Sequence, residues 1–209
     1  MSTMAITALV LYGVFIVLTA TKTQLQRRHG TDTGIRRPAS PLAWAARLPL
    51  ALGSLATGVA APIAELAGLT PLPGLDQPAL RTAGAALAAL GVAGTFATQL
   101  AMGQAWRTTP DETERPHLVT GGPFRIARNP IYTAYTAMSL GLALTVPNPI
   151  AVLGAAAVLI GVQMQVRAIE EPYLRRIHGA AYSGYAARTG RFLPGIGRLT
   201  DHTTTKGPR

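Results

Sequence analysis

Long apolar segments alternate with short polar ones along most of this chain. Five segments hold almost no charge, and a helix needs about 20 apolar residues to cross a bilayer. The first and the last two are slightly short, but flanking residues extend them. Together the pattern predicts an all-α integral membrane bundle with five transmembrane helices. The segments are residues 4–20, 43–69, 79–102, 131–146 and 150–166.

The composition agrees with a membrane protein. The chain is 48% hydrophobic and only 13% charged, whereas about a quarter of the residues are charged in soluble domains. Its 209 residues are enough for one domain. We therefore predict a single domain over residues 1–209, with the first three spans in residues 1–102.

The net charge of +10 is unevenly distributed. Basic residues fill the first and third connections and the segment after the last span, whereas residues 70–78 and 147–149 contain no Lys or Arg. Cytoplasmic loops are enriched in Lys and Arg. This predicts a multi-pass protein of the cell membrane with its N-terminus outside and its C-terminus cytoplasmic. Nucleic-acid binding is disfavoured, because aromatic residues do not interleave with the basic ones.

Three further features narrow the classes. Residues 4–20 lack the basic n-region of a signal peptide, so we predict a retained span. The chain has no cysteine, which excludes disulfides and thiolate chemistry. Its four histidines have no metal-ligand spacing, so no metal site is predicted.

Small and polar residues predict local features of the helices. Gly84, Gly91 and Gly94 in the third span favour close helix packing. Pro49 and Pro62 predict a kink in the second span or its ends. Tyr182, Tyr185 and Arg188 are typical of an amphipathic surface helix, which would lie on the cytoplasmic side after the last span.

One polar motif directly precedes the fourth span. Asn129 is a favoured N-cap and Pro130 suits the first helical position, so the helix is predicted to start here. Its free N–H groups, with Arg125 and Arg128 nearby, suit an anion. A capped helix with basic cytoplasmic flanks is the simpler alternative.

A second polar motif directly follows the fifth span. Arg167 and Glu171 are four residues apart, so on an α-helix they share a face and can pair, whereas Glu170 points elsewhere. A solvated ion pair is the alternative, but charge beside a membrane span usually marks a site. A pocket between this motif and the start of the fourth span suits an amphipathic cofactor and a lipid-like substrate.

These motifs, taken in order, strongly resemble the isoprenylcysteine carboxyl methyltransferase and phospholipid methyltransferase superfamily. The resemblance covers about residues 100–195, and its members are integral membrane enzymes that use S-adenosylmethionine. It implies a cofactor-binding core in residues 103–195. Independently of the resemblance, the polar composition beyond Gly195 predicts a flexible tail in residues 196–209. The motifs are 118–124, 128–132, Arg167-x-x-Glu170-Glu171, Tyr182-x-x-Tyr185 and 191–194.

The resemblance also implies roles for individual residues. Arg167 and Glu171 match the catalytic pair at the mouth where the methyl acceptor sits. The chain departs from the family pattern at Asn129, where His is common, at Phe124, where Tyr is common, and at Pro172, which is expected to bend the helix. The implied cofactor-binding residues are His117, Leu118, Val119, Phe124, Asn129, Pro130, Tyr132 and Glu170.

The predicted function is methyl transfer from S-adenosylmethionine to a lipophilic or isoprenoid-like acceptor at the cytoplasmic membrane face. Arg167 would orient a carboxylate acceptor, and Glu171 would take the proton of an amine or hydroxyl. Two other classes stay open. One is an NADPH-dependent membrane reductase of the sterol or enone type, and the other is a non-enzymatic membrane subunit.

Overall fold

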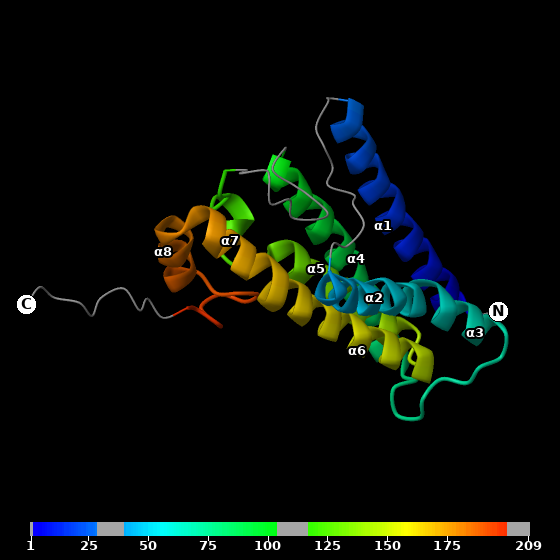
Figure 1. Cartoon of the computed structure of the whole chain (residues 1–209). Helices are drawn as coiled ribbons and strands as arrows, with labels where there is room; N and C mark the ends of the chain where they lie inside the picture. Colours follow the sequence, from blue (N-terminus) through cyan, green and yellow to red (C-terminus); the bar gives the residue numbers. More distant parts are fainter. Residues whose placement is uncertain (1, 29–39, 104–116, 200–209) are drawn as a thin grey trace, which may run out of the picture.

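The computed structural model describes residues 2–28, 40–103 and 117–199 (Figure 1). This part of the chain is helical apart from connections and one isolated bridge between Ala127 and Gly190, which confirms the predicted all-α class. The α-helices are α1 (Thr3–Arg28), α2 (Pro41–Leu55), α3 (Ala61–Leu66), α4 (Pro78–Met102), α5 (Pro130–Thr145), α6 (Pro149–Met164), α7 (Glu171–His178) and α8 (Ala180–Arg188). The chain also forms π-helical turns η1 (Ala56–Ala60) and η4 (Gln165–Glu170) and a 3₁₀ turn η3 (Gly122–Arg125).

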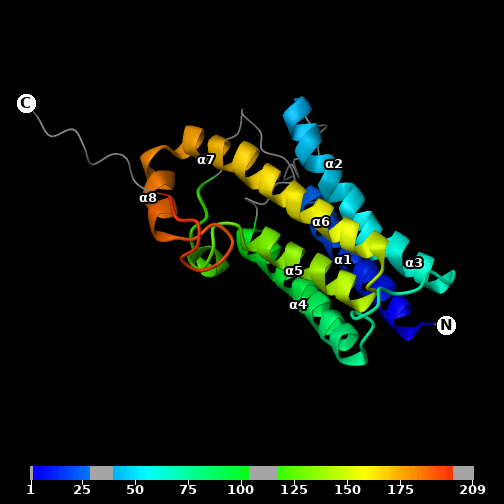
Figure 2. The same ribbon diagram turned by 90° about the horizontal axis from the view of Figure 1, so that it is seen from below.

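Four helical rods in the described part of the chain are long and apolar enough to cross a membrane. They are α1, the continuous Pro41–Leu66, α4 and the continuous Pro149–His178. The predicted span 131–146 corresponds to α5, whose 16 residues reach about 24 Å at 1.5 Å per residue. α5 is shorter than the four long rods, and it packs along α4 and beside α6 (Figure 2).

The predicted hairpin between the last two spans is present. Asn148 caps α6 by accepting from the Ala151 N–H at 3.1 Å, and its amide donates to the Ala61 carbonyl at 2.9 Å. At the same end, Arg81 forms an ion pair with Glu65 and donates to the Thr145 carbonyl at 3.0 Å. Polar contacts therefore connect α3, α4, α5 and α6 at this end of the bundle.

Each π-helical turn ends two residues before a proline. Pro62 follows η1 and Pro172 follows η4. A proline inside a helix lacks an N–H and its ring clashes with the carbonyl four residues back. A π turn relieves this by widening the helix locally. The structure thus has one wide turn shortly before Pro62 and one before Pro172, whereas Pro49 lies inside α2.

The glycines of α4 allow close contact with α5, as predicted. A Cβ built on Gly91 would lie 2.3 Å from the Met138 backbone nitrogen, and one on Gly84 would lie 2.8 Å from the Gly141 carbonyl oxygen. Gly94 is less tight, because its nearest atom is the Ala134 Cβ at 3.2 Å. Small residues at such contacts let two helices pack backbone to backbone inside a membrane.

Gly91→Ala is expected to destabilise the protein by about 1–3 kcal/mol, the usual cost of overpacking. The obstructing Met138 atoms belong to the backbone, so they cannot rotate away. Gly13→Ala is the matched control, because nothing lies within 4 Å of a Cβ at that position in α1, and it should stabilise by about 0.5–1 kcal/mol. Denaturation of both variants in detergent checks this, and equal stability would contradict the packing argument.

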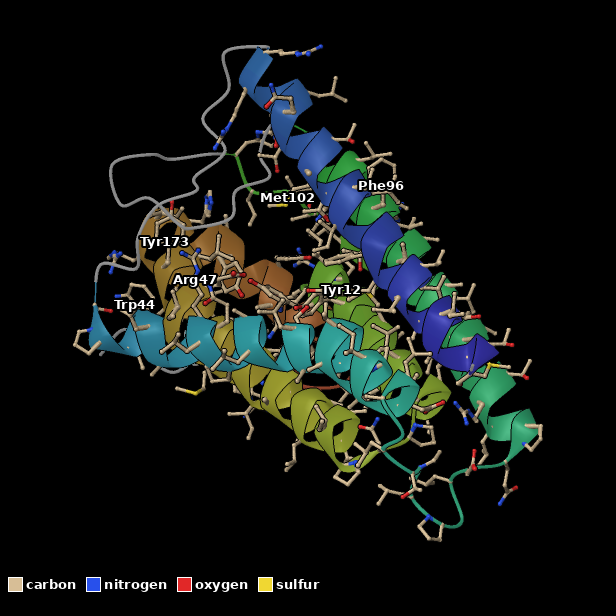
Figure 3. The ribbon with its side chains drawn as sticks, turned by 90° about the vertical axis from the view of Figure 1, so that its right-hand side faces the viewer. Tyr12, Trp44, Arg47, Phe96, Met102 and Tyr173 are labelled. Atoms are coloured by element: carbon tan, nitrogen blue, oxygen red, sulfur yellow. The ribbon has the colours of Figure 1, made fainter. Side chains whose placement is uncertain are left out.

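α1 and α2 diverge from the end where α3 lies, and Tyr12 lies in the angle between them (Figure 3). The Tyr12 hydroxyl is 3.1 Å from the Ser54 hydroxyl, which links the two rods. The Phe15 ring lies 6.0 Å from the Tyr12 ring and 5.7 Å from the Tyr135 ring. This aromatic row leads from the angle between α1 and α2 toward α5.

Some predictions concern residues outside the described part of the chain. They include most of the first connection (29–39), much of the long third connection (104–116) and most of the tail (200–209).

Candidate functional site

The segment after α8 returns to the start of α5. We call residues 189–199 the return segment. The Arg128 N–H donates to the Gly190 carbonyl at 2.8 Å, and the Asn129 N–H donates to the Arg191 carbonyl at 3.0 Å. Residues 62 apart in sequence are thus joined just before α5 begins.

Asn129 precedes α5 as predicted, but its side chain does not cap the helix. The amide instead donates to the Arg191 carbonyl at 3.2 Å. The first helical residue is Pro130, which has no N–H to satisfy, and the Asn129 carbonyl accepts from the Thr133 N–H at 3.1 Å. The residue therefore binds the return segment rather than the helix N-terminus.

A buried ion cluster holds this junction together. Glu171 accepts from Arg128 at 2.7 Å and from two nitrogens of Arg191 at 2.8 Å each. The Arg128 and Glu171 side chains are only 1% and 5% exposed. The hydrogen bond to Glu171 raises the pKa of Arg191. Charges buried this deeply need such pairing to be tolerated.

Arg128 also fixes the end of α8. Its guanidinium donates to the carbonyls of Ala186 and Gly197, each at 3.1 Å, and to that of Thr189. Cations are favourable at helix C-termini, where carbonyls lack partners inside the helix. α5, α7, α8 and the return segment therefore converge on one arginine.

Two tyrosines of α8 point inward rather than toward a surface. Tyr182 is 1% exposed and Tyr185 is 6% exposed, and the Tyr185 hydroxyl donates to the Phe124 carbonyl at 2.6 Å. Burial and the charge of Glu171 raise the pKa of Tyr182 to about 12. Burial and Tyr182 likewise raise the pKa of Tyr185 to about 12. Both phenols stay protonated at neutral pH and can donate hydrogen bonds.

These elements enclose a cavity of about 320 Å³, a volume within the range of ligand pockets. It lies at the end of the bundle where α7 and α8 are found (Figures 1 and 2). Every long rod contributes to its wall, as do α5, η3 and α8. The described lining residues are Phe15, Thr19, Leu50, Thr95, Gln99, Met102, His117, Leu118, Val119, Phe124, Arg128, Asn129, Pro130, Ile131, Tyr132, Tyr135, Glu170, Leu174, His178, Tyr182 and Tyr185.

All eight residues predicted to bind the cofactor line this one cavity. They come from three separate stretches of the chain, namely 117–124, 129–132 and Glu170. Their grouping is a property of the structure. Their role in binding a cofactor stays a prediction.

Arg167 and Glu171, predicted as the catalytic pair, are placed differently. Neither is among the lining residues, and the Arg167 side chain is exposed. Both Glu171 oxygens are bound by Arg128 and Arg191 instead. The predicted pairing assumed α-helical spacing, whereas η4 is a π turn in which residues five apart approach each other.

The carboxylate that does reach the cavity belongs to Glu170. Its Oε1 atom accepts from the Tyr132 hydroxyl at 2.5 Å and from the Gln165 amide at 3.1 Å. These two donors come from α5 and from η4, so the carboxylate is held between the two helices that the sequence predicted to converge. A carboxyl group held by two hydrogen bonds thus faces a mainly apolar space.

Sequence reasoning missed several polar residues of the lining, among them Gln99 and His178. Gln99 in α4 is 4% exposed, and its side-chain oxygen has no hydrogen-bond partner in the described chain. His178, at the end of α7, has a buried Nε2 atom that likewise lacks one. Gln99 interrupts the apolar pattern of the third span, and His178 lies eight residues after Glu170. Either feature is visible in the sequence.

No group of three or more His, Asp or Glu residues that could hold a metal occurs in the described ranges. The site is therefore described by its polar lining and its one carboxylate. Apolar rods that end in a cavity with a partly buried acid are typical of a helical membrane protein.

Residues 80–181 match the phospholipid methyltransferase family. The match covers just under half of the chain's length, so this region is similar to that family. The resemblance predicted from the motifs is thereby confirmed, and the activity class is that of a membrane methyltransferase. The matched region includes α4, α5, α6 and α7 and the first residues of α8. No curated protein matches the chain in sequence.

Proposed function

We propose that this protein transfers a methyl group from S-adenosylmethionine to a lipophilic or isoprenoid-like acceptor at the cytoplasmic face of the membrane. One observation carries the proposal. The eight motif residues expected to bind the cofactor surround a single cavity, and the Glu170 carboxylate lies in its wall. The phospholipid methyltransferase family, which generally uses this cofactor, supports the same reading.

The lining fits the cofactor chemically. S-adenosylmethionine carries a sulfonium, an ammonium, a carboxylate and a heterocycle, so it needs both donors and acceptors. Glu170 offers negative charge, which attracts a cation more strongly in an apolar wall than in water. The unpaired oxygen of Gln99 offers an acceptor, and the Nε of Arg128, unpaired within the described residues, offers a donor. Buried polar atoms without partners are rare and call for a ligand or water.

When bound, S-adenosylmethionine supplies a methyl group on a positively charged sulfur, which an acceptor oxygen or nitrogen displaces. The chain's own contribution is alignment and exclusion of water. Tyr132 and Gln165 hold the Glu170 carboxylate in one orientation. Glu170 is then able to take the proton that an amine or hydroxyl acceptor loses.

The predicted roles of Arg167 and Glu171 change accordingly. With both oxygens bound by arginines, Glu171 acts as a positioning residue, because it fixes the helix turn that carries Glu170. Arg167 is exposed in the same turn and does not line the cavity. A carboxylate acceptor bound to Arg167 would therefore lie outside the cavity. An amine or hydroxyl acceptor is favoured, since Glu171 already engages Arg128 in the wall, whereas Glu170 can take a proton.

The acceptor is proposed to be lipophilic because the N-terminal rods contribute apolar lining. Phe15 of α1 and Leu50 of α2 reach the cavity, and these rods diverge on the side where Tyr12 lies (Figure 3). A lipid or isoprenoid chain would rest against them, while its polar end meets Glu170.

We further propose five crossings, with the N-terminus outside and the C-terminus cytoplasmic. α5 would be the fifth and shortest crossing, packed among the longer rods. Basic residues before α5 and after α6 lie at the cavity end, consistent with a cytoplasmic face. α8 would then be a cytoplasmic helix whose tyrosines face the cavity and whose exposed Arg188 faces water or lipid head groups.

Binding of S-adenosylmethionine to the purified full chain in detergent tests the proposal by equilibrium dialysis. We expect binding of S-adenosylmethionine and none of NADPH. Arg128 is the one Lys or Arg among the described lining residues, and Glu171 already engages it, so little is left for a 2′-phosphate. Asn129→Ala should weaken binding about tenfold, because it removes a lining amide that also holds the return segment.

Gln77→Ala is the matched control, since this exposed amide lies before α4, at the start of the rod whose other end meets the cavity. It should bind the cofactor as the wild type does. Binding of NADPH alone would favour a reductase. Binding of neither, with alanine tolerated at Glu170 and Glu171, would favour a non-enzymatic subunit.

A further inference from the structure

The end of η4 and α7 together present a regular stripe to the cavity. Glu170, Leu174 and His178 all line it, and residues four apart lie on one helix face. Eight residues at 1.5 Å each place His178 about 12 Å from Glu170 along the helix axis. The stripe therefore extends along the cavity wall from the carboxyl group of Glu170 to the imidazole of His178.

The imidazole end is a polar atom in apolar surroundings. Leu118 and Leu174 pack against the buried tyrosines Tyr182 and Tyr185, and these four residues line the cavity together with His178. Within the described residues the His178 Nε2 atom is buried and has no hydrogen-bond partner. A buried polar atom left unpaired is unfavourable, so its presence in a cavity wall indicates a ligand group that pairs with it.

The two ends of the stripe differ in the ligand chemistry they favour. Glu170 offers a carboxyl group that is hydrogen-bonded by Tyr132, and a cationic group beside it would stabilise the ionised form. The other end offers two aromatic rings, two leucines and one imidazole nitrogen. Such surroundings suit a flat, uncharged heterocycle that stacks on rings and forms one or two hydrogen bonds. An adenine edge presents both a donor and an acceptor, so either imidazole tautomer pairs with it.

We propose that His178 contacts the nucleobase of S-adenosylmethionine, and that the cofactor lies along α7 with its sulfonium end near Glu170. This inference rests on the proposed function and adds to it a ligand-binding residue and the direction of the bound molecule. The methyl group then lies at the end of the cavity that Phe15 and Leu50 approach from the N-terminal rods. The base lies among Leu118, Tyr182 and Tyr185.

The test measures binding of S-adenosylmethionine and S-adenosylhomocysteine to the full chain in detergent. His178→Phe keeps a flat ring and removes the hydrogen bond, and it should weaken both ligands about tenfold. His178→Gln keeps a donor and an acceptor, and it should stay within about threefold of the wild type. Arg175→Ala, an exposed change on the same helix, should bind as the wild type does.

Competition locates the contact on the ligand. In His178→Phe, adenosine should need about tenfold more concentration to displace labelled S-adenosylmethionine, whereas methionine should compete unchanged. Equal affinity of His178→Phe and wild type overturns the inference while leaving the proposed function intact. An equal loss in His178→Phe and His178→Gln, or a shift in methionine competition, also overturns it. A wild type that binds neither ligand overturns the inference and the proposed function together.

Discussion

Arg128→Ala is expected to lower the free energy of unfolding by about 3–5 kcal/mol, the cost of breaking a buried ion pair. The change removes a donor from Glu171, which is only 5% exposed, and frees the carbonyls of Ala186 and Gly197. Glu171 would keep Arg191 as its partner, so the loss should fall short of complete unfolding. Denaturant titration in detergent micelles measures it.

Arg125→Ala is the matched control, because this arginine lies three residues earlier and its side chain is exposed. Surface changes of this kind usually alter stability by less than about 0.5 kcal/mol. The buried cluster would not be the main connection between α5, α7 and α8 if both variants lost the same small amount.

Glu170→Gln is expected to reduce the rate of methyl transfer at saturating substrate about a hundredfold or more. The amide still accepts the hydrogen bond from Tyr132, so the local structure should persist, but it can no longer take a proton. General base catalysis contributes about 10²–10⁴-fold where it operates. Transfer of radiolabelled methyl groups to lipids extracted from the host measures the effect.

Arg175→Ala serves as the control, since it is exposed on α7 and absent from the lining. Full activity in Glu170→Gln together with lost activity in Arg167→Ala would overturn our assignment. That outcome would indicate that Arg167 orients the methyl acceptor, and it would favour a carboxylate as the acceptor group. If Glu170→Gln lost cofactor binding but kept the rate of methyl transfer at saturation, Glu170 would bind the cofactor without taking a proton from the acceptor.

The helices could be predicted from the apolar pattern because membrane spans are long and nearly free of charge. The predicted span 79–102 and the observed Pro78–Met102 differ by one residue. α1 continues to Arg28 beyond the predicted limit at residue 20, since no glycine or proline interrupts the chain there. An apolar count marks where a span must lie, not where its helix stops.

The site could be predicted only in part. The motif residues that the resemblance singled out do line one cavity. The partner of Glu171 could not be read from local spacing, because Arg128 and Arg191 lie 43 and 20 residues away from it. The contribution of Phe15 and Leu50 to the cavity lining could not be predicted from the sequence either, since it depends on how the N-terminal rods pack against the matched region.

The wide turn η4 sets which side chains of α7 enter the cavity. A π turn contains one residue more than the α-helical turn it replaces, and its wider winding absorbs that residue without rotating the helix that follows. Winding the same residues as a regular α-helix, at about 100° per residue, would instead rotate everything after η4. Glu170, Leu174 and His178 would then leave the wall as a set. A homologue shortened by one position here would therefore keep its acid and the residue proposed to contact the base in the wall, with regular α-helical winding in place of the π turn.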